Sequence, residues 1–259
     1  MNKLTLTTLL ALFSFNALAS EKKSWDGSYA SLLIGYTHGN VNEKNGLSDY
    51  YVTNPDGYDY LVYGGGKTSL QSISGSIKLG YNITIPNSYL IGLELGTTFQ
   101  DASSKQRMID AYKVLPNGEP IYTDDQEAPL NVKTKINNYQ TLGLRVGHIL
   151  NEDMLFYVMG GGTFGKIERN LTQTGDSANW FLLGHSITER KNETGYVLGL
   201  GIEHKLNNKF SVKASYEYVN FGNIKMTYRG PTHSGQNDLI EQSHKLDFSN
   251  FAIGLAYQF

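Results

Sequence analysis

The amino-acid sequence predicts an all-β protein, specifically an eight-stranded antiparallel transmembrane β-barrel of the up-and-down type. Three observations lead to this fold class. Apolar residues alternate with small or polar ones along most of the chain, and no long 3.6-residue periodicity interrupts them. Nothing after residue 19 approaches the roughly 18 consecutive apolar residues that a membrane helix needs. The connections between alternating segments are short and long in turn.

The first 19 residues have the parts of a secretory signal peptide in the usual order. Lys3 supplies positive charge, residues 4–12 form a short apolar core, and Ala17-Leu18-Ala19 provides a small-residue cleavage site. A buried N-terminal helix is the alternative, and it does not explain this order. We therefore expect a signal peptide over residues 1–19 and a barrel domain over residues 20–259.

Eight segments with two-residue alternation are the expected strands. The segment 89–100 is the clearest, because Leu93 and Leu95 share one face while Glu94 and Gly96 share the other. The segment near 154–165 leaves its lipid-facing register open, since Phe156 and Tyr157 compete for the outer face. The eight expected strands lie near residues 28–38, 70–82, 89–100, 136–148, 154–165, 195–206, 210–220 and 250–259.

The connections alternate in length. Short turns are expected within 83–88, 150–153 and 206–209, and long loops near 39–69, 101–135, 166–194 and 221–246. Outer-membrane barrels have short periplasmic turns and longer extracellular loops, so this rhythm predicts four long extracellular loops. A soluble β-sandwich could have as many strands, but it does not usually place its apolar residues on one continuous outer face.

Charged residues indicate which face of each strand points inward. Each lysine or arginine at the bilayer midplane costs about 2–4 kcal/mol, so these charges are expected inside the barrel. The six residues concerned are Lys78, Glu94, Arg145, Glu203, Lys213 and Glu217. Three charges of each sign predict a lumenal ion-pair network, because an eight-stranded barrel has just enough room for side chains. A charged path for ions is the alternative.

Composition narrows the possible functions. The chain has 22 Lys and Arg against 24 Asp and Glu, a net charge of −2, which argues against a nucleic-acid partner. It has no cysteine, and its histidines lack zinc-site spacing. The stretch 160–166 approaches a P-loop, but Ile167 replaces the magnesium-binding Ser or Thr. We therefore expect no metal or cofactor. A mean hydropathy of −0.34 does not exclude a membrane barrel, since only alternate residues meet lipid.

Three segments resemble the small outer-membrane β-barrel proteins of the OmpA, OmpX and opacity-like superfamily. These are residues 25–36 at the first strand, residues 214–222 at the seventh, and the last strand. In that family the alternating last strand is a signal for the barrel-assembly machinery. Here the corresponding residues are Phe251, Ile253, Leu255, Tyr257 and Phe259. The resemblance implies integration into the outer membrane of a Gram-negative bacterium, with lipid and lipopolysaccharide as neighbours.

A hydrolase embedded in the barrel is the enzymatic alternative, with lipid A or peptides as substrate. It needs a base within hydrogen-bond reach of a nucleophile. His244 lies five residues before Ser249, so the two face opposite sides of a strand, and the adjacent His185 and Ser186 also diverge. The sequence therefore predicts no enzymatic activity.

The first long loop is the candidate binding surface. It combines tyrosines with Asn, Asp and Gly, a composition found in binding surfaces, although tyrosines near strand ends also form the aromatic girdle of membrane barrels. The tyrosines are Tyr50, Tyr51, Tyr58, Tyr60 and Tyr63. We expect a structural and surface-interaction protein with adhesin-like or defence-evading loops that contact host or extracellular ligands. A narrow porin-like channel for small or hydrophobic solutes is the alternative.

Overall fold

The computed structural model describes residues 25–43, 47–48, 59–63, 66–108, 111–114, 120–121, 130–173, 186–231 and 237–259. Eight long strands form the barrel: β1 (Gly27–Glu43), β4 (Gly66–Ile85), β5 (Tyr89–Met108), β8 (Leu130–Asn151), β9 (Met154–Gln173), β10 (Ser186–Lys205), β11 (Phe210–Pro231) and β12 (Asn237–Gln258). Four short strands complete the described chain: β2 (Leu47–Ser48), β3 (Asp59–Tyr63), β6 (Ala111–Val114) and β7 (Pro120–Ile121). The predicted signal peptide over residues 1–19 lies outside the described residues.

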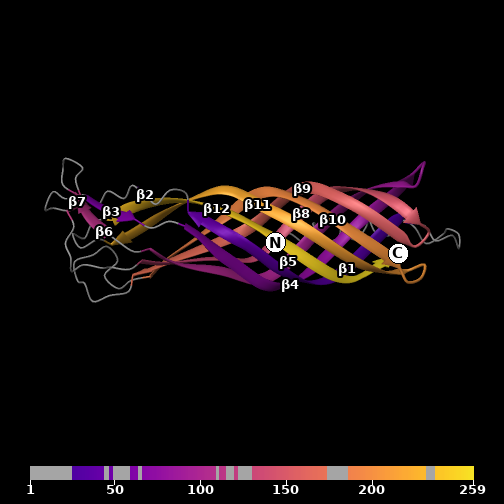
Figure 1. Ribbon diagram of the computed structural model, residues 1–259, viewed down its shortest axis with the longest axis horizontal. Helices are drawn as coiled ribbons and strands as arrows, with labels where there is room; N and C mark the ends of the chain where they lie inside the picture. The colour runs from indigo at the N-terminus through magenta and orange to yellow at the C-terminus, as the bar shows by residue number, and fades with distance from the viewer. Residues whose placement is uncertain are drawn as a thin grey trace, which may run out of the picture.

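The eight long strands close into one antiparallel ring in the order β1-β12-β11-β10-β9-β8-β5-β4 (Figure 1). Each strand therefore pairs with its neighbours in sequence, and the last strand closes the ring against the first. Ala30 opposes Tyr257 in the closing ladder, and the backbone N–H of Phe259 donates to the carbonyl of Ser28 at 3.0 Å. The predicted eight-stranded up-and-down barrel is confirmed. In the described part of the chain, no helix is long and apolar enough to cross a membrane.

An apolar belt surrounds the part of the barrel next to the three short turns, which we call its lower part. Its side chains point outward from every strand, as the two-residue period requires. The upper limit of this apolar belt runs through Tyr36, Ile73, Phe99, Phe164, Tyr196 and Phe251. On β9 the exposed residues are Phe156 and Val158, whereas Leu155 and Tyr157 are buried. The register of this strand, which the sequence left open, is thus decided by the barrel interior.

The three turns below the belt are short, and asparagine side chains shape two of them. Asn151 Oδ1 accepts hydrogen bonds from the backbone N–H groups of Asp153 and Met154. Asn207 Oδ1 accepts in the same way from Lys209 and Phe210. Such local hydrogen bonds favour a tight turn over continued strand. The short ends of outer-membrane barrels face the periplasm, so a barrel of this kind is expected to direct its long end outward from the cell.

The strands continue well past the belt, which corrects the predicted loop boundaries. β11 and β12 have 22 residues each and leave only residues 232–236 between them, so the expected long loop near 221–246 is almost entirely strand. The connections 44–65, 109–129 and 174–185 are likewise shorter than predicted. The sequence suggested loops because polar residues are frequent here, but these residues alternate with apolar ones that face inward. We call this part of the barrel, above the apolar belt, the extension.

In the extension the barrel divides into two facing sheets. The β10–β11 ladder ends at Tyr196 opposite Asn220, and the β4–β5 ladder ends at Gln71 opposite Ser103. The other ladders continue, so β4-β1-β12-β11 form one sheet and β5-β8-β9-β10 the other. Register shifts mark the boundary on three strands, at Asn220/Gly222, Phe99/Ala102 and Ile136/Tyr139. Bulges bend and twist strands, which suits a change from a round barrel to a flatter section.

A second sheet of four short strands lies beyond the far end of the extension, in the order β2-β3-β6-β7 (Figure 1). It joins the first and second connections, since Leu61 of β3 opposes Tyr112 of β6. Tyr60 and Tyr63 belong to β3, whereas Tyr50, Tyr51 and Tyr58 lie outside the described residues. Part of the first loop therefore forms β-strands, and these pair with strands of the second loop.

Candidate functional site: the charged lumen and the extension

The six charges predicted to face inward all lie in the barrel interior at the level of the apolar belt. None of their side chains is more than 5% exposed, and those of Arg145 and Lys213 are fully buried. They come from β4, β5, β8, β10 and β11, because each strand presents alternate residues to the lumen. Several strands therefore bring charges together that are far apart in the sequence.

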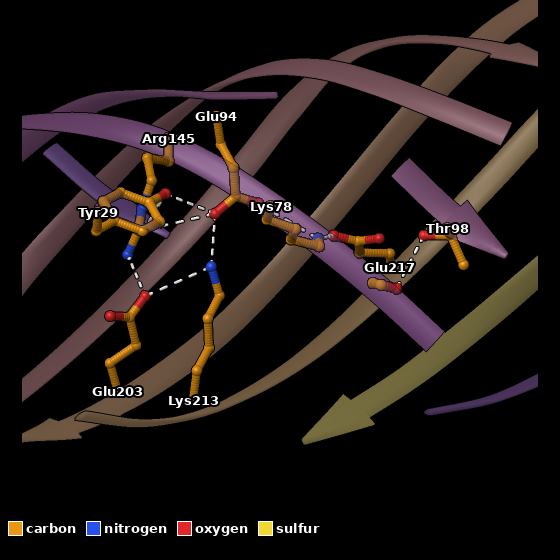
Figure 2. A network of polar contacts seen from close by, with 9 residues as sticks. Tyr29, Lys78, Glu94, Thr98, Arg145, Glu203, Lys213 and Glu217 are labelled. Atoms are coloured by element: carbon orange, nitrogen blue, oxygen red, sulfur yellow. Dashed lines mark hydrogen bonds and ion pairs between the residues drawn. The ribbon is translucent and has the colours of Figure 1, made fainter. Parts of the chain in front are cut away.

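These charges form one connected network of ion pairs (Figure 2). Glu94 lies at its centre: its carboxylate is 2.5 Å from Lys213 Nζ and 3.3 Å from Lys78 Nζ. Arg145 joins Glu94 at 3.6 Å and Glu203 at 2.8 Å. Lys78 also pairs with Glu217, which extends the network upward. Each buried charge thus has an opposite charge beside it, as burial away from water requires.

Two tyrosines complete the network, and the sequence reasoning missed both. Tyr29 Oη donates to Glu94 at 2.6 Å and accepts from Arg145 at 2.6 Å. The guanidinium carbon of Arg145 lies 3.9 Å from the ring centre of Tyr157, a cation–π contact. Both rings fit because a glycine faces them on the next strand. A Cβ at Gly80 would lie 2.4 Å from Tyr29, and one at Gly201 would lie 2.3 Å from Tyr157.

A layer of uncharged hydrogen bonds lies above the charges. Asn250 Nδ2 donates to Thr37 Oγ1 at 2.9 Å and to Ser74 Oγ at 2.6 Å. Thr37 Oγ1 in turn donates to Gln100 Oε1 at 2.6 Å. All four side chains are buried or nearly so, and they come from β1, β4, β5 and β12. These four strands are consecutive in the ring, so the hydrogen bonds join its β12-β1-β4-β5 side directly beneath the extension.

Apolar side chains occupy the lumen at both ends of this polar region. At the periplasmic end Trp25 packs with Leu90, Leu155 and Tyr157, and the Lys205 ammonium lies 4.6 Å from the indole ring centre. In the extension a larger cluster fills the space between the two sheets. Its members include Leu70, Leu246 and Ile224 from one sheet, and Val132, Ile136 and Ile167 from the other. The interior is therefore apolar, then charged, then apolar again along the barrel axis.

One polar pair lies within the apolar core of the extension. Arg169 Nη1 is 2.6 Å from His244 Nδ1, and both side chains are fully buried. Burial, followed by the positive charges of Arg169 and Lys191, lowers the pKa of His244 to about 3. His244 is therefore neutral at physiological pH, with Nδ1 able to accept the hydrogen bond from the guanidinium.

His244 and Ser249, which were weighed for a hydrolase, do not form a catalytic pair. His244 points into the core, whereas Ser249 is bonded on the outer face to the hydroxyl of Tyr216 at 2.7 Å. His38 lies opposite Ser249 in the β1–β12 ladder, but in the described structure Ser249 uses Tyr216 as its hydrogen-bond partner. His185 lies outside the described residues. The described residues also contain no group of three or more His, Asp or Glu side chains placed to hold a metal ion.

The terminal strand presents its apolar side chains to the outside. Phe251, Ile253, Leu255 and Phe259 are between 49% and 56% exposed. Tyr257 is partly covered, because its ring lies 5.1 Å from those of Phe210 and Phe259. The residues expected to form the assembly signal therefore share one lipid-facing side of β12, next to the seam that closes the barrel.

Comparison with known proteins identifies the family. A family model described as the outer membrane protein beta-barrel domain matches residues 6–259. The chain belongs to this family. The predicted relationship to small outer-membrane barrels of Gram-negative bacteria, and the outer membrane as location, are thereby confirmed. A relative from Brucella melitensis, the 31 kDa outer-membrane immunogenic protein, is 24% identical over 274 residues, which cover 100% of both chains.

Solved structures of other outer-membrane proteins are similar to this chain. The outer membrane protease OmpT of Escherichia coli is 12% identical, with a TM-score of 0.50 over 95% of this chain and 100% of that one. The attachment invasion locus protein Ail of Yersinia pestis is 16% identical, with a TM-score of 0.39 over 90% of this chain and 99% of that one. At 12% identity the likeness to OmpT concerns the architecture alone.

Proposed function

We propose that this protein is a non-conducting, non-enzymatic outer-membrane barrel that holds a β-structured extension and its loops outside the cell for contact with other molecules. The supporting observation is the filled interior. Six charged side chains neutralise one another with at most 5% exposure, and an apolar core follows above them. A small barrel whose interior is filled by side chains in this way is suited to serve as an anchor, because packed side chains take the space that a solute would need.

The difference between the membrane-level part of the barrel and the extension supports the presentation of the loops outside the cell. The belt and the charged lumen hold the protein in the membrane, while the strands carry the three longest connections well beyond the lipid. Two of these connections share a four-stranded sheet. Loops held by a rigid scaffold are where binding residues concentrate. The description of the Brucella relative as immunogenic fits a surface-exposed member of the same family.

Conductance and adhesion test the two halves of this proposal separately. In planar bilayers the purified protein is expected to give no reproducible channel. A conductance that changes on Arg145→Ala or Glu94→Gln would instead support the narrow transport barrel.

The role of the loops is tested by replacing residues 44–65 and 109–129 together by short turns. This change is expected to leave a heat-modifiable barrel on gels, while bacterial adhesion to host cells or matrix proteins falls.

A matched control shortens residues 174–185, which contribute no strand to the four-stranded sheet. Adhesion that survives the double replacement, or that falls equally with the control, would contradict a role for the shared sheet. Activity on lipid A or peptides that disappears with His38→Ala would contradict the non-enzymatic part.

A further inference from the structure

Two lysines face each other on the outer surface of the extension. Lys105 of β5 is directly opposite Lys133 of β8 in the antiparallel ladder, and both side chains are exposed. Directly opposed residues have Cβ atoms about 4.5–5.5 Å apart, and like charges in that position destabilise a sheet. Asp101, whose pKa is lowered by Lys135 and also by the charge of Lys133, offsets part of the repulsion. No described carboxylate forms a direct ion pair with either lysine.

The neighbouring acids are already engaged by other cations. Asp101 is 2.8 Å from Lys135, whose hydrogen bond lowers the pKa of that carboxyl group. Glu168 is 2.7 Å from Arg190. The same sheet presents a third exposed lysine, Lys166 of β9, which has no ion-pair partner among the described residues. Lys105, Lys133 and Lys166 thus form a cationic face on the β5-β8-β9-β10 sheet.

Protection of a strand edge does not account for Lys133 and Lys166 in this cationic face. Lysines often shield unpaired strand edges from other chains. Here β5 pairs with β8 as far as Met108 opposite Leu130, and β8 pairs with β9 as far as Leu130 opposite Gln173. Lys133 and Lys166 therefore stand on strands that are paired on both sides, where no edge needs shielding. Lys105 differs, because the β4–β5 ladder ends at Ser103 and β5 is an edge strand at its level.

The height of the cationic face above the membrane suggests what neutralises it. Lys166 follows the last belt residue of β9, Phe164, by two positions, which corresponds to about 5 Å along the axis of a tilted strand. Lys105 follows Phe99 of β5 by six positions, or about 15 Å. Anionic groups at these two heights belong to the outer leaflet. Lipopolysaccharide carries phosphates where its lipid meets water, and phosphates and carboxylates in the sugars above.

We propose that the cationic face formed by Lys105, Lys133 and Lys166 binds the phosphate and carboxylate groups of lipopolysaccharide. Lys166 meets the phosphate next to the acyl chains, and the opposed pair binds an anionic group of the core sugars between its two ammonium groups. Asn170 lies beside this pair and directs its amide toward Ser186 and Thr188, which adds hydrogen-bonding groups suited to a sugar. Bound lipid would order the extension relative to the leaflet.

Thermal unfolding in a non-ionic detergent, with and without lipopolysaccharide, tests this proposal. The variant is Lys105→Gln with Lys133→Gln. The matched control is Lys67→Gln with Lys225→Gln, which removes two exposed lysines from the opposite sheet. Without lipid, the variant is expected to be at least as stable as the wild type, because the repulsion is relieved. The affinity of the variant for labelled lipopolysaccharide is expected to fall about tenfold, because two exposed charge contacts are lost. The control is expected to retain binding.

Chemically altered ligands identify the group that is bound. Dephosphorylated lipopolysaccharide is expected to bind the wild type about as weakly as intact lipid binds the variant. Equal losses in the variant and the control would overturn the proposal, because they would show attraction by net charge alone. Tight binding of a soluble sulfated polysaccharide without binding of lipopolysaccharide would overturn it as well, since the face would then recognise a polyanion outside the membrane.

Discussion

At the level of the membrane the barrel has apolar side chains outside and charged ones inside, whereas the extension above the belt has the opposite arrangement. Both regions use the same eight strands and the same two-residue alternation. The surroundings differ: lipid requires an apolar exterior below, and water favours a polar one above. The strand pattern is therefore common to both regions, and the solvent around each strand determines which face is apolar.

The difference has consequences for stability. Below the belt's upper limit, the interior depends on matched charges, so that one substitution affects every partner in the network. In the extension, the interior depends on close packing of apolar groups, and the loss at each site scales with the contacts removed. The two regions should therefore respond differently to mutation and to pH.

The largest effect is expected from Arg145→Met in the charged lumen. This change leaves Glu203, 2.8 Å from the guanidinium, and the central Glu94 with fewer positive neighbours in a buried site. Breaking a buried pair in this way costs about 3–5 kcal/mol. Urea unfolding in detergent measures the loss. Arg190→Met, which removes an exposed pair with Glu168, is the control and is expected to cost about 0–1 kcal/mol. Similar losses for both variants would contradict the distinction.

A smaller and more local effect is expected from Phe248→Ala in the extension. The Phe248 ring lies 5.3 Å from that of Tyr139 and 6.2 Å from that of Phe221, and its side chain is buried. Truncation leaves a cavity and costs about 3 kcal/mol. Hydrogen exchange is expected to accelerate in the extension while the belt stays protected. Phe251→Ala, three residues further on and facing lipid, should leave exchange in the extension unchanged. Faster exchange throughout the barrel would show that the two regions unfold as one.

The smallest effect is expected from pH and depends on His244. Its pKa of about 3 in the folded protein lies below its ordinary value of 6.5, so the unfolded chain takes up the proton first as the pH falls. The stabilisation is complete above about pH 6.5 and is lost progressively toward pH 3. At pH 5 the loss is about 2 kcal/mol. Amide hydrogen-exchange rates in the extension, compared at pH 7 and pH 5, measure this loss of stability.

His244→Gln provides the control for this pH dependence, because glutamine keeps a polar group in the core but does not titrate. The variant is expected to lose the difference between pH 7 and pH 5, whereas the same change at exposed His204 leaves it intact. An unchanged pH profile in His244→Gln would assign the effect to another group.

Much of the membrane-level barrel could be predicted because lipid imposes a simple rule on alternating residues. Lys78, Glu94 and Arg145 occupy strand faces that hydrocarbon would not tolerate, so their inward direction followed from position alone. Tyr29 and Tyr157 were missed because an aromatic residue suits either face. The small residues that oppose them, Gly80 and Gly201, were the available signal, but strand register had to be known before it could be used.

The extension was misread for a related reason. Its strands carry polar residues outside, and segments such as 130–136 resemble polar loops when the outer face is expected to be apolar. The alternation was nevertheless present: Val132 and Ile136 are buried, whereas Lys133 is exposed. A search for alternation of either polarity would have lengthened these strands.

The sequence by itself determined the architecture and the location, because two-residue alternation, short turns and a terminal apolar strand depend only on local order. Tertiary structure alone decided which charges meet, where the barrel divides into two sheets, and that Lys105 lies opposite Lys133. These features depend on the register between strands that are distant in the chain. Register is set by how all eight strands pack around one lumen, which no single segment specifies.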